Sequence, residues 1–224
     1  MSFDGYSHLD LRYADVPRVQ RPAPIARWSP RYRVFKFAFD KGMSIAAMPI
    51  ILGVAVVLLL LNPFLNPGPL FFRQERMGLG GQKFLMWKFR TMLPSNTVVR
   101  HHNEPLEEDR ITPLGRFLRK TRLDELPNFF NVLRGEMSVI GPRPDAWSHA
   151  RSYVGTVPHY QLRFRVRPGI TGLAQIHAGY ADCDHAIRRK ARFDRLYVSR
   201  SRIKMELHII WHTVRVMLTG WGAK

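Results

Sequence analysis

The sequence predicts an α+β fold, with a membrane-inserted N-terminal helix followed by a small, mainly helical domain that carries a short β-hairpin. Three observations lead to this prediction. Residues 43–61 form a run of nineteen residues without a charge. Two strand-like segments, 70–74 and 83–90, are separated by a glycine-rich turn. Helical apolar periodicity marks 114–121, 124–134, 184–197 and 204–218.

Composition limits the classes of protein that fit. The chain has 224 residues, of which 46% are hydrophobic, so one domain with an appendage and a real core is expected. Lys and Arg number 35 against 17 Asp and Glu, a formal charge of +18 that favours a polyanionic partner. Such partners are nucleic acid, an anionic membrane surface or a phosphorylated substrate. Cys183 is the only cysteine, which excludes an intrachain disulfide and nearly excludes a cysteine-based zinc site.

The first 30 residues are polar and interrupted by prolines, and they lack the apolar segment of a cleaved signal peptide. We therefore divide the chain into a flexible tail (1–30), a membrane-inserted helix (31–66) and a basic domain at the membrane surface (67–224).

The uncharged run would extend about 28 Å as a helix, close to the thickness of the bilayer core. Basic residues flank it on both sides, so the positive-inside rule gives no preferred direction. Pro49 lies inside the run and can bend the helix. A re-entrant helix, bent at Pro49, would keep both flanks on one side of the membrane. A single tilted span with a proline kink is the alternative.

The segments after the hairpin are predicted to be helical. The glycine at 135 is expected to end the 124–134 helix. The 204–218 segment places apolar residues on or near one face, which is typical of an interfacial helix on a membrane, although a core helix would have the same pattern.

The segment Arg119–Pro127 carries the most suggestive chemistry. Asp124 and Glu125 are adjacent carboxylates that directly follow a basic stretch. At the start of a helix their side chains diverge, so one can react while the other binds a metal or a proton. Asp124 near a helix N-terminus and several arginines should have a lowered pKa. The simpler alternative is that Asp124 caps the helix.

Two further segments present arginines. Arg143 lies between Pro142 and Pro144, which stiffen the backbone and suit bidentate contact with a phosphate; a structural ion pair in a turn is the alternative. Arg167 precedes Gly169 and Gly172, in a loop that resembles an anion-binding loop; the signal is weak, because the loop matches no standard phosphate-binding spacing.

Strand alternation in 86–92 places Lys88 and Arg90 on one face and Trp87 and Phe89 on the other. A basic face above aromatic residues could bind single-stranded nucleic acid. A half-buried strand with a solvated side is the commoner explanation. No recognisable nucleic-acid motif is present, so we expect no nucleic-acid partner.

The order of the segments is more specific than any one of them. The apolar run is followed by Pro-Gly-Pro, FFRQERMG (71–78), MWKFRTM (86–92), TPLGRFLRKTRLDELPNFFNVLRGEMSVIGPRP (112–144) and RPGITGLAQ (167–175). This order resembles the bacterial sugar transferase family, the monotopic phosphoglycosyl transferases that start exopolysaccharide and glycoconjugate synthesis. The resemblance covers roughly residues 31–219.

The resemblance implies an enzyme that transfers a sugar 1-phosphate from a UDP-sugar to a polyprenyl phosphate such as undecaprenyl phosphate, with release of UMP. It also implies the bacterial inner membrane as the location, with the catalytic domain on the cytoplasmic face. An inactive scaffold and a basic membrane-associated nucleic-acid-binding protein are the alternatives. A homodimer is compatible with the sequence, which does not decide the oligomeric state.

The resemblance also implies site residues. Asp124 would be the nucleophile that forms a phosphoglycosyl-aspartate, and Glu125 would assist by proton transfer or metal organisation. Mg²⁺ is the expected cofactor, held by Asp124 together with Glu125. The phosphate-binding cations would be Lys88, Arg119, Arg143 and Arg167.

The chain departs from the family pattern at two places. Many relatives break their membrane helix at a Ser-Pro further along the run, whereas here the proline is Pro49, preceded by Met48. After GLAQ the chain reads IHAGYAD where many relatives have Asn-Gly-Arg, which concerns sugar preference. Resemblance to exopolysaccharide-type members favours galactose or glucose phosphate.

Overall fold

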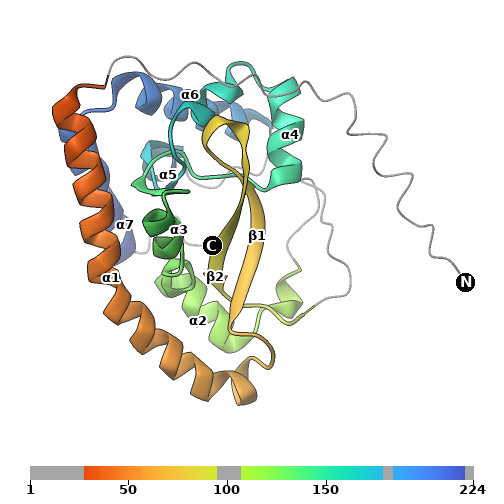
Figure 1. Cartoon of the computed structure of the whole chain (residues 1–224). Helices are drawn as coiled ribbons and strands as arrows, with labels where there is room; N and C mark the ends of the chain where they lie inside the picture. Colours follow the sequence, from red (N-terminus) through yellow and green to blue (C-terminus); the bar gives the residue numbers. More distant parts are fainter. Residues whose placement is uncertain (1–27, 95–106, 179–183, 220–224) are drawn as a thin grey trace, which may run out of the picture.

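The structure, a computed structural model, describes residues 28–94, 107–178 and 184–219. Most of the predicted tail therefore lies outside the described residues, as do 179–182 of the IHAGYAD segment. The α+β prediction is confirmed: a long N-terminal helix lies along a mainly helical body that carries a β-hairpin (Figure 1).

Helix α1 (Pro30–Leu65) is the longest element. The Ser29 hydroxyl accepts from the Tyr32 amide at 3.2 Å and caps its start. The helix continues through Pro49 without interruption and bends, so its red and orange halves run at an angle in Figure 1. Its buried residues recur mostly every three or four positions, which places one face against the body: Tyr32, Lys36, Asp40, Ser44, Ala47, Ile51, Leu58 and Asn62.

Strands β1 (Phe71–Met77) and β2 (Lys83–Phe89) form the predicted antiparallel hairpin, with Phe71 opposite Phe89. The turn contains the 3-10 segment η2 (Leu79–Gly81), in which Gly80 has φ 65°. Neither basic residue predicted on the solvated side is exposed: Arg90 is buried and Lys88 is half-buried. Both cations make internal contacts, so Lys88 and Arg90 do not form an exposed basic face.

The segment predicted as one helix over 124–134 is divided. After η3 (Glu108–Arg110) and α2 (Pro113–Thr121), the chain makes a separate 3-10 turn, η4 (Leu123–Glu125), before α3 (Asn128–Arg134). Arg122 closes α2 with φ 60°, and Pro127 immediately precedes α3. Gly135, with φ 80°, ends α3 as predicted.

The glycines of the 169–172 loop serve backbone packing. Strands β3 (Ser138–Ile140) and β4 (Gly169–Thr171) pair in parallel. A Cβ on Gly169 would lie 2.1 Å from the Gly141 nitrogen, and one on Gly172 would lie 2.1 Å from the Gly141 oxygen. The glycines therefore allow one backbone segment to approach another, which gives them a packing role in the β3–β4 pair.

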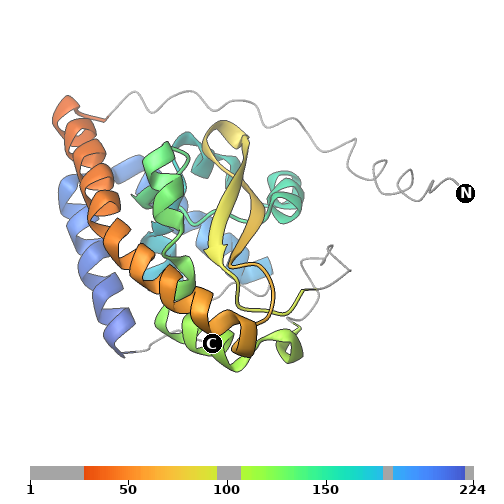
Figure 2. The same cartoon turned by 60° about the horizontal axis from the view of Figure 1, so that its bottom comes forward.

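Four further helices and a 3-10 segment complete the described body: α4 (Trp147–Thr156), η5 (Tyr160–Arg165), α5 (Leu173–Ala178), α6 (Asp184–Arg200) and α7 (Ile203–Thr219). Helix α7 lies beside the N-terminal half of α1 in both views (Figures 1 and 2). Ile209 and Glu206 are buried, whereas Leu207, Trp211 and Val214 form an exposed apolar stripe. This stripe agrees with the predicted interfacial pattern.

Both ends of α1 are attached to the body through buried polar contacts. Near the N-terminal end, Lys36 Nζ lies 2.6 Å from Glu206 Oε2 of α7. At the C-terminal end, the Asn66 amide donates to the Arg90 carbonyl at 2.9 Å, and Arg90 donates to the carbonyls of Asn66 and Pro69. Helix α1 therefore lies along the body and does not project from it.

Candidate active site

Asp124 and Glu125 lie together in η4, which directly follows Arg122 and its left-handed backbone conformation. Only 7% of Asp124 and 8% of Glu125 is exposed. The cap position of α3 is occupied by Pro127 and no side chain caps this helix, so the capping alternative for Asp124 is wrong. Two buried, adjacent carboxyl groups are costly unless they are compensated by cations.

Glu125 receives most of that compensation. Arg143 Nη1 donates to Oε2 at 2.9 Å, and Nη2 donates to Oε1. Lys88 Nζ from β2 donates to the same Oε1 at 3.0 Å. Burial acts to raise the pKa of Glu125, but the charges of Arg143 and Lys88 outweigh it and hold the pKa well below its usual value.

Asp124 has a different environment. Its Oδ2 lies 3.9 Å from Lys88 Nζ, and no described residue donates a hydrogen bond to its buried Oδ1. Burial raises the pKa of Asp124 and the charge of Glu125 adds to this, while Lys88, Arg143 and Arg119 act against it. The expected lowering of the pKa was therefore wrong, because Asp124 is buried and because Arg143 and Lys88 bind Glu125.

The backbone of Arg143 is fixed by a second group of buried charges. Its carbonyl accepts from Arg163 Nη2, and Arg163 also pairs with Asp145 and, at 3.1 Å, with Asp194 of α6. Lys190 lies 2.5 Å from Asp145. Arg143 does form an ion pair in a turn, as the structural alternative proposed, but the partner is one of the two candidate carboxylates.

The other two predicted cations have different positions. Arg119, in the last turn of α2, donates from Nε to Thr91 Oγ1 at 2.9 Å, and its charge reaches Asp124. Arg167 is exposed, and its guanidinium lies near Gly135, at the end of α3 away from η4. The structure thus brings Lys88, Arg119 and Arg143 to the carboxylates but does not bring Arg167 to them.

The sequence model of the bacterial sugar transferase family matches residues 31–220, which include all of these side chains. The chain belongs to this family. The match covers the membrane-type helix, the hairpin and the carboxylate turn as one unit.

Individual relatives of this bacterial sugar transferase agree with that assignment. It is 41% identical, over 71% of its length, to a UDP-glucose:undecaprenyl-phosphate glucose-1-phosphate transferase from Klebsiella pneumoniae, of which it covers 37%. It is 36% identical, over 88% of its length, to a UDP-N-acetylgalactosamine-undecaprenyl-phosphate N-acetylgalactosaminephosphotransferase from Aeromonas hydrophila, of which it covers 46%. The chain therefore spans less than half the length of these two relatives.

A third relative has a similar size. The exopolysaccharide production protein PSS from Rhizobium leguminosarum bv. phaseoli is 37% identical over 83% of this chain, and the match covers 96% of that protein.

One further cation that interacts with Glu125 was not predicted from the sequence. Arg76 of β1 donates from Nη1 to the Pro144 carbonyl at 3.0 Å, and its Nε finds no acceptor among the described residues. Burial, followed by the charge of Arg143, lowers the pKa of Arg76 to about 10, while Glu125 acts against this. The FFRQERMG segment contains two arginines, Arg73 and Arg76. Strand alternation places them on opposite faces but does not show which face lies toward the carboxylates.

The donor set of the site limits the kind of metal it could hold. Within the described ranges there is no group of three or more His, Cys, Asp or Glu side chains that could bind a metal by themselves. Mg²⁺ commonly uses only one or two carboxylates and takes its remaining ligands from water and substrate phosphates. Asp124 Oδ1, buried and without a donor among the described residues, is a suitable oxygen for such a site.

Proposed function

We propose that this bacterial sugar transferase moves a sugar 1-phosphate from a UDP-sugar to undecaprenyl or another polyprenyl phosphate, with Asp124 as the nucleophile. The observation that carries the proposal is the difference in hydrogen bonding between the two carboxylates. Both oxygens of Glu125 accept hydrogen bonds from Arg143 or Lys88, whereas Asp124 Oδ1 has no donor among the described residues. The undecaprenyl-phosphate substrates in the names of two relatives support the choice of acceptor.

The reaction then takes two steps. An Asp124 carboxylate oxygen attacks the β-phosphorus of the UDP-sugar; the new O–P bond forms as the bond to the bridging oxygen breaks, and UMP leaves with that electron pair. A phosphate oxygen of the lipid acceptor next attacks the same phosphorus. The Asp124–phosphorus bond breaks, which regenerates the carboxylate and leaves a polyprenyl diphosphate-sugar.

The cations around the pair provide charge neutralisation, which is the main protein contribution to phosphoryl transfer. Glu125 positions Arg143 and Lys88 next to Asp124. Its pKa, held well below the usual value, makes it a poor proton donor, so we assign it the organising role. Arg119 and Arg76 add positive charge at the edges of the same site.

Mg²⁺ fits this arrangement. Asp124 would hold it, with Glu125 nearby, and the diphosphate would complete its ligands. When bound, the ion would neutralise charge on the phosphate oxygens.

The membrane proposal rests on α1. Of the described residues, α1 is the helix long and apolar enough to cross a membrane. Its outward face exposes many large apolar side chains, while both of its ends contact the same body. We therefore propose a re-entrant placement in the bacterial inner membrane, with the body on the cytoplasmic face against anionic headgroups.

The experiment that tests the reaction separates its two halves. Full-length protein in lipid nanodiscs is incubated with Mg²⁺ and a panel of UDP-glucose, UDP-galactose and UDP-N-acetylgalactosamine, without acceptor. We expect UMP in an amount equal to the enzyme, and a protein mass increased by one sugar phosphate, for the preferred sugar. Asp124→Asn should lose both, with turnover reduced on the order of 10³-fold or more.

Glu75→Gln is the control, since Glu75 pairs with Lys83 at the half-exposed surface of the hairpin. Turnover with acceptor but without any labelled protein would indicate direct displacement and would overturn the role of Asp124.

A further inference from the structure

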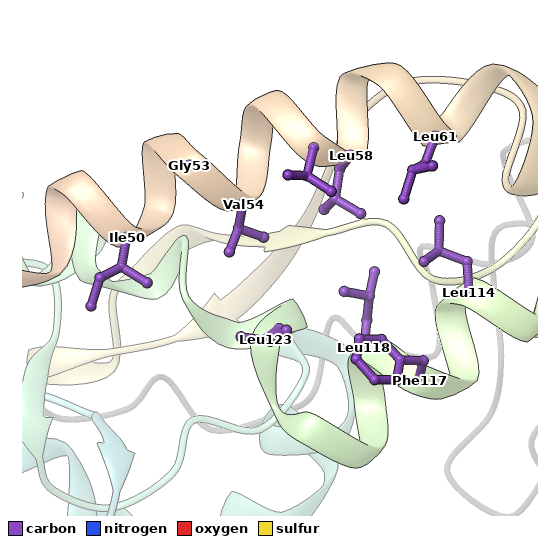
Figure 3. Close-up of a pocket in the computed structure, with 10 residues that line it drawn as sticks. Ile50, Gly53, Val54, Leu58, Leu61, Leu114, Phe117, Leu118 and Leu123 are labelled. Carbon is purple, nitrogen blue, oxygen red and sulfur yellow. The ribbon is translucent and has the colours of Figure 1, made fainter.

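An apolar groove of about 380 Å³ runs between the C-terminal half of α1 and the α2–η4 segment. All of the residues that line it are apolar. Figure 3 shows side chains from the two walls pointing toward one another: Ile50, Val54 and Leu58 from α1, and Leu114, Leu118 and Leu123 from the facing wall.

The groove ends next to the nucleophile. Leu123 lines the groove, and the following residue is Asp124. Their Cα atoms are about 3.8 Å apart, as for any trans peptide. Leu123 and Asp124 are consecutive in the 3-10 turn η4, in which neighbouring side chains point in different directions. Leu123 faces the groove, whereas Asp124 lies beside Lys88.

The chemistry around the groove selects its occupant. Arg119, Lys120 and Arg122 follow the groove residues Phe117 and Leu118 at the end of α2, so positive charge adjoins an apolar channel. This combination fits a molecule with an apolar chain and an anionic phosphate at one end. The α1 wall belongs to the helix whose outer face is exposed and apolar, so the groove is continuous with the surface proposed to enter the bilayer.

We propose that the groove binds the isoprenoid chain of the lipid acceptor and that the acceptor phosphate lies at its Leu123 end, next to Asp124. This inference rests on the proposed function and adds to it the location of the acceptor subsite. A substrate whose reactive phosphate is the end of its apolar chain can use a groove that ends at the nucleophile. A phospholipid is less suitable, because its phosphate is esterified on both sides.

Two glycines of α1 offer a matched pair of variants. Gly53 lines the groove, and a Cβ placed on it would meet nothing within 4 Å. Gly42 lies in the same helix, and a Cβ there would also meet nothing within 4 Å, but this residue does not line the groove. Gly53→Leu should therefore place a side chain in the groove from a position at which the Cβ itself has room. Gly42→Leu makes the same chemical change elsewhere on the helix.

The experiment measures kcat/KM for the acceptor and for the UDP-sugar, with each full-length variant in nanodiscs. In a ping-pong reaction, kcat/KM for the acceptor reports the second half, and kcat/KM for the UDP-sugar reports the first. For Gly53→Leu we expect at least a 10-fold fall in kcat/KM for undecaprenyl phosphate, with UMP release in the absence of acceptor unchanged. Gly42→Leu should change neither value.

A second pair of variants keeps the test valid if Gly53→Leu does not fold. Phe117 lines the groove and is 56% exposed, so Phe117→Ala removes groove surface without emptying the core. Phe72, 47% exposed on β1, provides the control Phe72→Ala. We expect a 3- to 10-fold fall in the acceptor kcat/KM for Phe117→Ala alone.

Unchanged acceptor kcat/KM in both groove variants would overturn the proposal. An equal loss in Gly42→Leu would also overturn it, because the effect would then belong to helix insertion. Failure of the unmodified protein to release UMP without acceptor would instead contradict the proposed function, so the two failures are distinguishable.

Discussion

Arg143 and Glu125 form a bidentate ion pair, in which Nη1 donates to Oε2 at 2.9 Å and Nη2 donates to Oε1. Lys88 donates to Oε1 as well, so both oxygens of Glu125 are bound to cations. The adjacent Asp124 retains an oxygen without a donor among the described residues. Neighbouring carboxyl groups in different environments are the usual way in which a site gives two acids two roles.

The first prediction concerns pH. The carboxylate form of Asp124 is the proposed nucleophile, and burial together with the charge of Glu125 raises its pKa. Acceptor-independent UMP release should therefore decline as the pH falls through this raised pKa. Glu125→Gln removes the second cause and leaves the charges of Lys88 and Arg143 to act on Asp124. The acidic limb should move to lower pH, while the rate near neutrality falls by about 10-fold or more because Arg143 loses its ionic partner.

The check is the pH profile of the UMP burst for both proteins. An acidic limb at the same pH in Glu125→Gln would show that Glu125 does not control the protonation of Asp124.

The second prediction concerns the attachment of α1. Glu206 is fully buried and lies 2.6 Å from Lys36, so Glu206→Gln leaves a buried ammonium without its strongest partner. The free energy of unfolding should fall by about 3 kcal/mol or more. The comparison is Glu75→Gln, which breaks the half-exposed 2.9 Å pair with Lys83 and should cost less than about 1 kcal/mol. Thermal unfolding in detergent measures both, and equal losses would contradict the prediction.

The third prediction concerns the glycine contacts. Gly169→Ala would place a Cβ 2.1 Å from the Gly141 nitrogen, which requires the β3–β4 pair to separate. We expect a loss of about 3 kcal/mol or more in the free energy of unfolding. At Gly155 in α4 a Cβ meets nothing within 4 Å, so Gly155→Ala should be neutral or stabilising by up to about 1 kcal/mol. A similar effect of the two substitutions would argue against the backbone contact.

The fourth prediction concerns topology. In a Cys183→Ser background, single cysteines are introduced at Ser29, before α1, and at Pro67, after it; both positions are exposed. A re-entrant α1 makes both cysteines react with a membrane-impermeant maleimide in inside-out vesicles and neither in intact spheroplasts. Labelling of the two positions from opposite sides would establish a single span.

Much of the framework could be predicted from local sequence. The apolar run predicted α1, the glycine-rich turn predicted the hairpin, and Gly135 correctly ended α3. The motif order also named the residues that meet at Asp124, including Lys88 and Arg143. Each of these signals depends on residues close in sequence or on a family pattern that is long and specific.

Other features depend on contacts between distant segments. Strands β3 and β4 are three residues each and pair across a long stretch of chain, so neither has a periodicity of its own. The environment of Asp124 depends on whether Arg143 binds Asp124 or Glu125, and this could not be predicted from the sequence. Arg167, like Arg143, is an arginine beside a proline in a family motif, yet its guanidinium lies near Gly135.

Ile51 and Leu58 of α1 pack with Phe89 and Leu118 in one buried cluster, so the boundary drawn at residues 66/67 by composition crosses a hydrophobic core. A chain cut there would leave Phe89 and Leu118 facing water. A freely diffusing version of this transferase cannot therefore be expected from deletion of its anchor alone. Solubilising it would require redesign of the outward side of α1 while its inward side chains are kept.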